Sequence, residues 1–377
     1  MPRENGGVVG RKNYNTPYTA SGMYSLRTHF LNVYDGTWPS APGNYFLAVA
    51  HSTAPNITIY PWNDTSGFGT KYTDSASAPN VTTGDATRFN NAGNAVAVST
   101  TASPFIHTYV WSAAGFGTKY SNPGTLPAGA VTDLVFSGDN NYLAVASSTS
   151  PYLHVYSWSN ISGYGTRYSP ATIAAGAPSS VAFDAAATSV AIAHGTSPYV
   201  TGYQWSSSGF GSKLADPASL PAGIGRGIDI NPLGNVLAVA HNTNPQLSLY
   251  PWSASTGYGT KYAQPSVTIG GGNGYAVKFN PAGDAIIVGS STANFLFAYQ
   301  WDNSTGFGSR FASPVSLGTI VGEVAFSKTG LSVAAVNGTS PYVHAFPFNR
   351  TTGIGTKFSD PSQLPAGTGN GVAFGQL

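Results

Sequence analysis

Apolar and polar residues alternate with a period of two along short segments of this chain. The alternation is clearest in residues 105–111, where one face carries Phe105, His107, Tyr109 and Trp111. A period of two predicts a β-strand with one face in a core. Around this segment, residues 86–90, 95–99 and 117–120 also have the composition of strands, and turns rich in Gly and Pro separate them. The pattern predicts a unit of four strands joined up and down.

This unit returns along the chain. Each copy contains Gly-aromatic-Gly-Thr/Ser-Lys/Arg-aromatic, first at Gly67–Tyr72, with Ile354 and Leu214 as aliphatic exceptions. The following copies begin at Gly115, Gly163, Gly209, Gly257, Gly306 and Gly353, at offsets of 48, 48, 46, 48, 49 and 47 residues. A fixed period of this length with four strands per unit is typical of a β-propeller. We predict an all-β fold with seven four-stranded antiparallel blades over residues 43–377.

The two ends of the repeat predict how the ring closes. The first unit begins at Gly43 and lacks its first strand, whereas the chain ends in a surplus first strand at residues 371–374. Pairing that strand with residues 45–51 would complete the first blade and remove an open sheet edge. This closure resembles that of WD40-type propellers. The resemblance is architectural, because the Gly-His pair is absent and Trp-Asp occurs once, at Trp301-Asp302.

Residues 1–42 lie outside the repeat and are interpreted as an N-terminal anchoring arm. Ser25 is a candidate N-cap for one short amphipathic helix over residues 25–34, in which Leu26, Phe30 and Val33 share a face. A helix of about ten residues is marginal alone, so we expect it to dock on another surface. With Trp38 it offers a small apolar binding surface, either for this propeller or for another protein.

Composition removes several classes of function. The net charge is +2 and only 8% of residues are charged, so nucleic acid is not expected as a partner. The absence of Cys excludes disulfides and thiolate metal sites. No signal peptide or membrane-spanning segment is apparent, and membrane insertion is not expected. No nucleophile–base pair, phosphate loop or metal-ligand spacing appears, so we expect no enzyme activity, no cofactor and no metal.

Three columns of polar residues remain as candidates. Charges vary from blade to blade on the predicted channel strands, at Arg88, Asp133, Asp229, Lys278 and Glu323. They form either a polar site on the axis or pairs with one another, Lys278 with Glu323 of the next blade and Arg226 or Lys278 with Asp229, and pairing explains most of this column. Three histidines, His51, His194 and His241, fall on one rim, but their blades are too far apart for a shared ion. Every repeat carries one cation on its outermost strand, where it opposes edge-to-edge pairing or forms a basic belt for a partner. These cations are Lys71, Lys119, Arg167, Lys213, Lys261, Arg310 and Lys357.

Two groups of motifs resemble virion proteins of tailed bacteriophages. In the repeat these are Thr339-Ser340-Pro341-Tyr342 with its counterparts, the Gly-Phe-Gly-Thr-Lys-Tyr motif, and the Leu-Pro-Ala-Gly that follows it. In the arm, residues 20–26 followed by Trp38-Pro39 resemble an Ala-Ser-Gly-x-Trp-Ser-Leu … Trp-Pro motif, with Tyr24 in place of Trp. The resemblance implies a non-enzymatic structural protein of the tail or its appendages, located in the virion and bound to other virion proteins through the arm. The alternative is a lectin-like or host-receptor-binding propeller that recognises a surface glycan or receptor.

Overall fold

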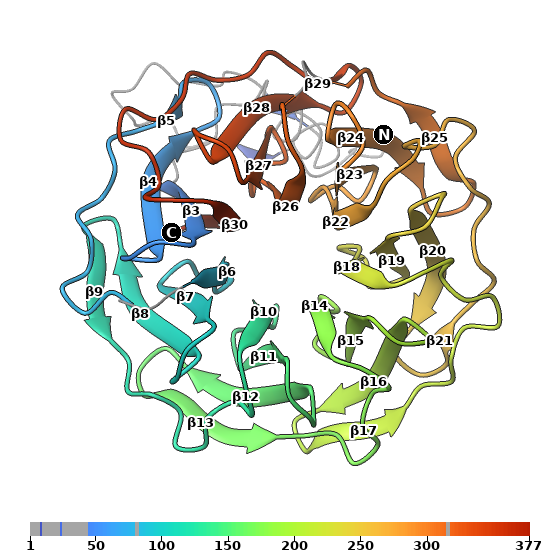
Figure 1. The fold of residues 1–377 in the computed structure, drawn as a ribbon, viewed down its shortest axis with the longest axis horizontal. Helices are drawn as coiled ribbons and strands as arrows, with labels where there is room; N and C mark the ends of the chain where they lie inside the picture. The colour runs from blue at the N-terminus through green and yellow to red at the C-terminus, as the bar shows by residue number, and fades with distance from the viewer. Residues whose placement is uncertain (1–7, 10–22, 25–43, 80–82, 314–316) are drawn as a thin grey trace, which may run out of the picture.

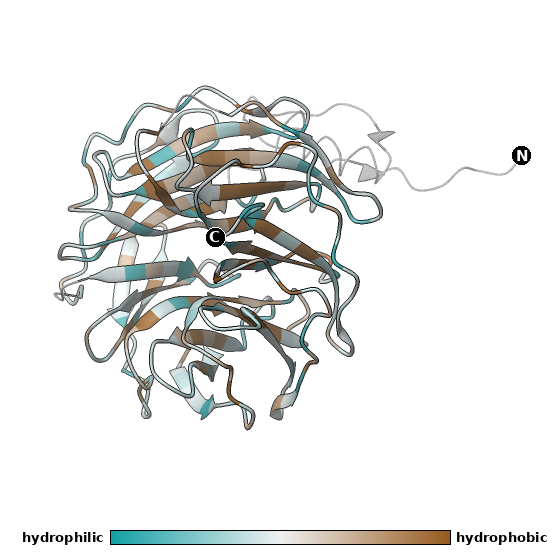
Figure 2. Cartoon of the chain, turned by 45° about the vertical axis from the view of Figure 1, so that its right-hand side comes forward, coloured by the Kyte–Doolittle hydropathy of each residue, from teal (hydrophilic) through white to brown (hydrophobic). Residues whose placement is uncertain are grey.

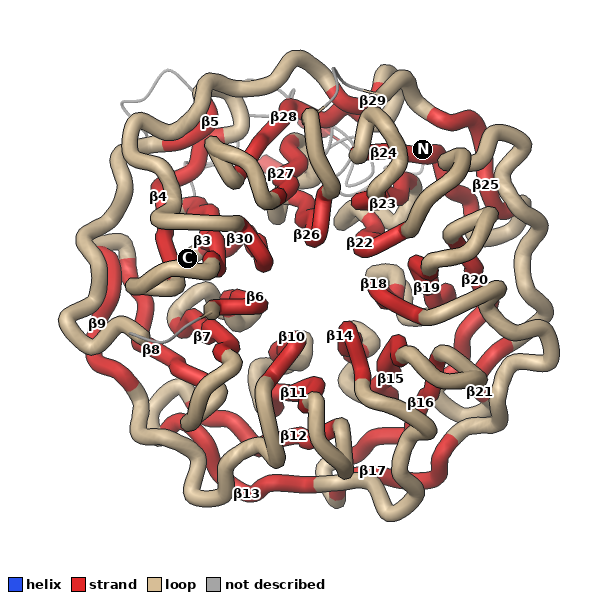
Figure 3. Tube along the Cα trace, viewed as in Figure 1, coloured by secondary structure: helices blue, strands red, loops and turns tan. Residues whose placement is uncertain are grey.

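Seven four-stranded antiparallel sheets stand side by side around a central axis (Figure 1). The structure is a computed structural model that describes residues 8–9, 23–24, 44–79, 83–313 and 317–377. Within these ranges it contains strands, turns and loops but no helix (Figure 3), and therefore no helix long and apolar enough to span a bilayer. The predicted helix over residues 25–34, and with it Leu26, Phe30, Val33 and Trp38, lies outside the described residues.

The blades are numbered along the chain, and each is given from the axis outward. Blade 1 is β30 (Gly369–Gln376), β3 (Tyr45–His51), β4 (Ile57–Asn63) and β5 (Gly67–Phe68); blade 2 is β6 (Gly84–Phe89), β7 (Ala95–Thr100), β8 (Ile106–Ser112) and β9 (Gly115–Lys119). Blade 3 is β10 (Val131–Phe136), β11 (Tyr142–Ser147), β12 (Leu153–Ser159) and β13 (Gly163–Tyr168); blade 4 is β14 (Pro178–Phe183), β15 (Ser189–His194), β16 (Val200–Ser206) and β17 (Gly209–Lys213). Blade 5 is β18 (Gly225–Ile230), β19 (Val236–His241), β20 (Leu247–Ser253) and β21 (Gly257–Tyr258); blade 6 is β22 (Gly274–Phe279), β23 (Ala285–Ser290), β24 (Leu296–Asp302) and β25 (Gly306–Arg310). Blade 7 is β26 (Val321–Phe326), β27 (Ser332–Asn337), β28 (Val343–Asn349) and β29 (Gly353–Ile354), and a separate short pair joins β1 (Val8–Val9) and β2 (Met23–Tyr24).

The C-terminal strand closes the ring as the sequence predicts. β30 pairs antiparallel with β3, from Tyr45 opposite Gln376 to His51 opposite Gly369. The paired strand is longer than the expected residues 371–374. One blade therefore combines the two ends of the propeller, which leaves no gap between blades 7 and 2.

The core lies between neighbouring blades. Seven hydrophobic clusters each combine second- and third-strand residues of adjacent blades, and Figure 2 shows hydrophobic segments running along the strands. The third strands carry two aromatic columns that the sequence predicts to pack between blades: Tyr60, Tyr109, Tyr156, Tyr203, Tyr250, Tyr299 and Phe346, and Trp62, Trp111, Trp158, Trp205, Trp252, Trp301 and Phe348. All of them are almost fully buried, so this packing is confirmed. Their rings meet outer-strand aromatics edge to face, as Trp205 meets Phe210 at a centroid distance of 5.0 Å.

Proline sets the length of the outermost strand in each blade. β9, β13, β17 and β25 have five or six residues, whereas β5, β21 and β29 have two. In the three short cases the residue between the third-strand aromatics is Pro61, Pro251 or Pro347. Its carbonyl still accepts a hydrogen bond from the outer segment, for example from the Gly69 amide at 2.8 Å. Since Pro has no N–H to return, we infer that the outer ladder stops there.

Several strand bounds in blade 2 differ from those expected, and the outer strand runs over Gly115–Lys119 and not over residues 117–120. The third strand begins at Ile106 and not at Phe105, because Phe105 has a φ of 70° and is not extended. The inner strand begins at Gly84, two residues before the expected start. A register shift between Gly84 and Thr87 makes this end irregular, and alternation alone does not reveal such a shift.

The indole N–H of the third-strand Trp explains how several blades are joined. In blade 3, Trp158 Nε1 donates to Asn160 Oδ1 at 2.9 Å, and Asn90 of blade 2 donates to the same oxygen. Blade 2 has Ala113 at the position of Asn160, and among the described residues no partner receives the Trp111 N–H. We expect Ala113→Asn to raise the free energy of unfolding by about 1 kcal/mol, because it satisfies a buried donor.

The measurement is the thermal or denaturant midpoint of Ala113→Asn against Ala114→Asn. The exposed neighbour provides the same chemical change away from the indole, and the expected effect there is below about 0.5 kcal/mol. Equal midpoints for the two variants would show that the Trp111 N–H is already satisfied, for instance by water.

Candidate ligand site in the central channel

The inner strands surround the axis, and the equivalent positions on them form three rings of residues (Figure 1). The first ring lies near the start of these strands, at the register shift, and consists of Asp85, Thr132, Ser179, Arg226, Tyr275, Gly322 and Asn370. The second ring consists of Ala86, Asp133, Ser180, Gly227, Ala276, Glu323 and Gly371. The third ring consists of Arg88, Val135, Ala182, Asp229, Lys278, Ala325 and Ala373, each opposite a small or aliphatic second-strand residue.

Five charged residues of the second and third rings form a network of two ion-paired groups. Arg88 Nη2 lies 3.1 Å from Asp133 Oδ1 and 3.6 Å from Glu323 Oε1, so its guanidinium links blade 3 to blade 7 past blade 1. Lys278 Nζ lies 3.6 Å from Asp229 Oδ1. Pairing between these charges is therefore confirmed. Glu323 was predicted to pair with Lys278, but it pairs with Arg88.

The carboxylates of the network are unequally satisfied. Asp133 is buried and accepts hydrogen bonds from the Leu134 and Val181 amides and from Ser180 Oγ, in addition to Arg88. Asp229 accepts one from the Phe279 amide at 2.8 Å. In contrast, Glu323 Oε1 is buried and has no hydrogen-bond partner among the described residues. Burial raises the pKa of the Glu323 carboxyl, and the nearby Arg88 and Lys278 only partly oppose this effect.

First-ring side chains reach from one blade to the next. Thr132 Oγ1 donates to the Pro178 carbonyl at 2.9 Å, and the Arg226 guanidinium lies over the Tyr275 ring at 4.8 Å. Asp85 differs, because no described residue offers its carboxyl a hydrogen bond or an ion pair. Burial raises the pKa of Asp85 to about 6. The sequence analysis overlooked Asp85 and Tyr275, although the same variation from blade to blade marks their column.

The rim histidines form hydrogen bonds with hydroxyl groups of the third strands. His51 Nε2 lies 2.9 Å from Thr58 Oγ1, and His194 and His241 pair in the same way with Thr201 and Ser248. In blades 2, 3 and 7 the histidine moves to the facing third-strand position, at His107, His154 and His344. Among the described residues, no cluster of three potential metal ligands occurs.

The repeat cations are engaged with neighbouring polar groups. Lys71, Lys213 and Lys357 pair with the Asp three residues later, at 2.8, 2.5 and 2.6 Å, and Lys119 donates to Asn122. Arg167, Lys261 and Arg310 donate to backbone carbonyls of the preceding crossover loop. The expected outer-strand position is wrong for three of them, because proline shortens β5, β21 and β29 and leaves the following cations in loops: Lys71, Lys261 and Lys357. A basic belt for a partner stays a prediction.

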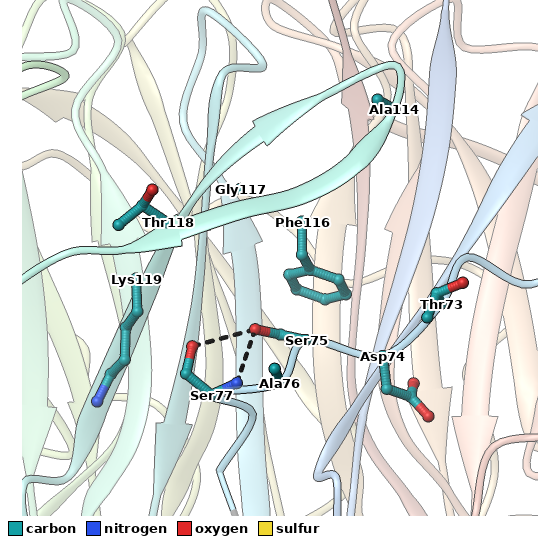
Figure 4. Close-up of a pocket in the computed structure, with 10 residues that line it drawn as sticks. All are labelled: Thr73, Asp74, Ser75, Ala76, Ser77, Ala114, Phe116, Gly117, Thr118 and Lys119. Carbon is teal, nitrogen blue, oxygen red and sulfur yellow. Dashed lines mark hydrogen bonds between the residues drawn. The ribbon is translucent and has the colours of Figure 1, made fainter.

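A groove of about 600 Å³ lies at the junction of blades 1 and 2 (Figure 4). Phe116 of β9 faces the loop that carries Asp74, Ser75 and Ser77. At other junctions a buried proline occupies the position of Ser75, as Pro123 does. The groove therefore exists because the smaller serine replaces proline at this junction. Its two charged side chains are engaged, because Asp74 pairs with Lys71 and Lys119 donates a hydrogen bond to Asn122. The channel is the stronger candidate for chemistry.

No family model matches the sequence, and no curated protein matches it either. Several solved structures share its fold. A periplasmic gluconolactonase from Pseudomonas aeruginosa aligns with a TM-score of 0.64 and 15% identity, over 88% of this chain and 99% of the other. A proposed 6-phosphogluconolactonase from Bacteroides fragilis gives 0.65 and 10%, over 89% and 99%. A protein from Lactobacillus plantarum gives 0.67 and 14%, over 89% and 99%.

These comparisons correct the function predicted from the sequence. A structural protein of a tailed-phage virion, or its lectin-like alternative, is contradicted, because the functions named among these neighbours are those of lactonases and none of the three is described as a phage component. The phage-like motifs of the repeat are short segments of turns and strands, which propellers of different function can share; the arm motif at residues 20–26 and 38–39 lies mostly outside the described residues. At such low identity the likeness establishes a propeller fold, and the three rings define its candidate site.

Proposed function

We propose that the protein is a propeller hydrolase that opens a polyhydroxylated lactone in its central channel. The observation that carries this proposal is the Glu323 carboxylate on the inner strand of blade 7, which forms an ion pair with Arg88 at 3.6 Å but accepts no hydrogen bond at Oε1 from the described residues. Solvent reaches this region, since the side chains of Glu323, Lys278 and Asp229 are 17%, 20% and 21% exposed. The lactonases among the structural neighbours supply the class of reaction to be tested.

The proposed chemistry divides between three side chains. Glu323 takes a proton from a water molecule, whose oxygen then attacks the lactone carbonyl carbon. Lys278 has three donors and one distant partner, so its ammonium is available to stabilise the oxyanion. The ring C–O bond breaks, and the leaving alkoxide oxygen receives the proton from Glu323. Arg88 does not touch the substrate in this scheme; it positions Glu323 and is itself held by Asp133.

The sequence spoke against a propeller enzyme such as a lactonase, because the channel acids and histidines were too few and unpaired in pattern and no nucleophile–base pair was present. No comparison tests that expectation. General-base hydrolysis needs no protein nucleophile, because water attacks directly. A carboxylate whose pKa lies above its usual value is also a better base near neutral pH than an ordinary surface carboxylate.

The test is the hydrolysis of glucono-1,5-lactone by the full-length protein and by Glu323→Gln. We expect kcat to fall by about 100-fold or more, as it does when a general base is removed. The wild-type rate should rise with pH through the elevated pKa of Glu323. Since burial already disfavours its charge, the variant should keep the wild-type melting temperature.

Asp216→Asn is the matched control, because it removes a carboxylate at the outer rim, where Asp216 binds Lys213. It should hydrolyse the lactone at the wild-type rate. Wild-type protein that does not accelerate the reaction over buffer, or a Glu323→Gln variant with full activity, would overturn the proposed function.

A further inference from the structure

The channel carries more negative than positive charge where a ligand would enter. Along its length it holds four carboxyl groups, Asp85, Asp133, Asp229 and Glu323, against three cations, Arg88, Arg226 and Lys278, an excess of one negative charge. In the first two rings alone the balance is three carboxyls, Asp85, Asp133 and Glu323, against Arg226. Blade 1 adds Asn370, Gly371 and Ala373, and blade 4 adds Ser179, Ser180 and Ala182, all without charge.

The three cations of the channel are engaged by neighbouring residues more completely than its four carboxyl groups. Arg88 is engaged by Asp133 at 3.1 Å, and Lys278 by Asp229. Arg226 is stacked on Tyr275. Among the described residues, Asp85 has no ion pair or hydrogen bond, and Glu323 has only the 3.6 Å contact with Arg88, which Asp133 also engages. Lys328, in the turn after β26, lies at the opposite end of the inner strands and does not alter this balance.

From this arrangement, and on the basis of the proposed function, we infer that the channel selects uncharged polyhydroxylated lactones and rejects phosphorylated ones. Hydroxyl groups of the ligand donate to the carboxylates of Asp85 and Glu323, which accept hydrogen bonds when ionised. A phosphate would bring two negative charges beside Asp85 and Glu323. Like charges within a few ångströms of each other repel strongly in a site that water screens poorly.

The alternative is that Arg226 binds a phosphate, since its Nε is buried without a partner. Two observations weigh against this. The guanidinium face is occupied by Tyr275, and one cation in the first ring is outweighed by Asp85 in that ring and Glu323 in the next. The alternative predicts the opposite selectivity, so one experiment separates the two.

The experiment measures binding of glucono-1,5-lactam and its 6-phosphate, which are not hydrolysed, to the full-length protein by calorimetry. We expect the uncharged lactam to bind at least about tenfold more tightly at low salt, with the difference shrinking as salt screens the repulsion. The Asp85→Asn variant should reduce this difference in affinity several-fold, whereas Arg226→Gln should not reduce it. Asp216→Asn, with the same change of charge at the outer rim, should leave it unchanged.

Tighter binding of the phosphorylated lactam, or equal binding of the two, would overturn the inference. So would binding of neither compound, or a preference that Asp85→Asn leaves unaltered. The proposed function is judged separately by hydrolysis of glucono-1,5-lactone. A protein that hydrolyses this lactone but prefers the phosphorylated lactam would keep the function and lose the inference.

Discussion

Removal of residues 370–377 should abolish the folded ring. The deletion removes nearly all of β30, including the buried Val372 and Phe374, and Phe374 packs on Trp62 at a centroid distance of 5.2 Å. It also leaves the inner edge of β3 unpaired. Burial of each large apolar side chain contributes about 2 kcal/mol, and each lost hydrogen bond adds about 1 kcal/mol. The total approaches the about 5–15 kcal/mol that stabilises a typical domain.

Circular dichroism and thermal melting of the truncated protein provide the measurement. Deletion of Leu377 alone is the matched control, because this residue is 41% exposed and follows β30. A synthetic peptide of residues 369–377 should restore the ring by pairing with β3. A truncated protein that melts at the full-length temperature would show that β30 does not hold the ring closed.

The protein should lose stability steeply as the pH falls from 6.5 toward 4. Burial lowers the pKa of six histidines from 6.5 to about 4: His51, His107, His154, His194, His241 and His344. These groups are neutral in the folded protein, whereas the unfolded chain binds protons below about pH 6.5. Each therefore removes up to about 1.4 kcal/mol of stability per pH unit within this window.

Acidic groups with a raised pKa act in the opposite direction. The pKa of Asp85 is raised to about 6, and those of Asp229 and Glu323 are also raised. The folded protein therefore binds protons at these groups before the unfolded chain does, which adds stability as the pH falls. Three groups cannot offset six, so the net effect is a loss, and we expect acid unfolding between about pH 4 and 6.

Melting temperatures between pH 7 and pH 4 measure this effect. His194→Ser is a suitable variant, because Ser147 and Ser290 occupy the same position in blades 3 and 6. The lost contact with Thr201 should lower its stability at neutral pH, but its pH dependence should be shallower than that of the wild type. A melting temperature that stays constant from pH 7 to pH 4.5 would contradict burial of these histidines in the neutral form.

The repeat made the fold predictable because each blade repeats the same packing demands. The Trp and Tyr columns, the Gly turns and the surplus strand at the C-terminus all reflect contacts that every blade must make. Local departures were harder to predict. The start of β8 depends on the positive φ of Phe105, and the two-residue β5 depends on the missing N–H of Pro61. Each of these departures depends on a single residue within a blade, so the average pattern of the repeat does not reveal it.

The candidate site was only partly predictable from the sequence. Arg88 and Glu323 stand out in the sequence, because packing between blades does not require charged residues on the inner strands. Their pairing was not predictable, because it depends on how far the Arg88 side chain reaches past blade 1. The repeat motifs that suggested a virion protein lie in turns and outer segments of the blades, and they carry no information on the channel. The function had to be inferred from the residues that differ between blades.

The most direct test of the account is a crystal structure of the protein with glucono-1,5-lactam bound. The account predicts the ligand in the central channel, with its carbonyl oxygen toward Lys278 Nζ and a hydroxyl group or an ordered water on the Glu323 carboxylate. A ligand bound in the groove beside Phe116, with an unoccupied channel, would contradict it.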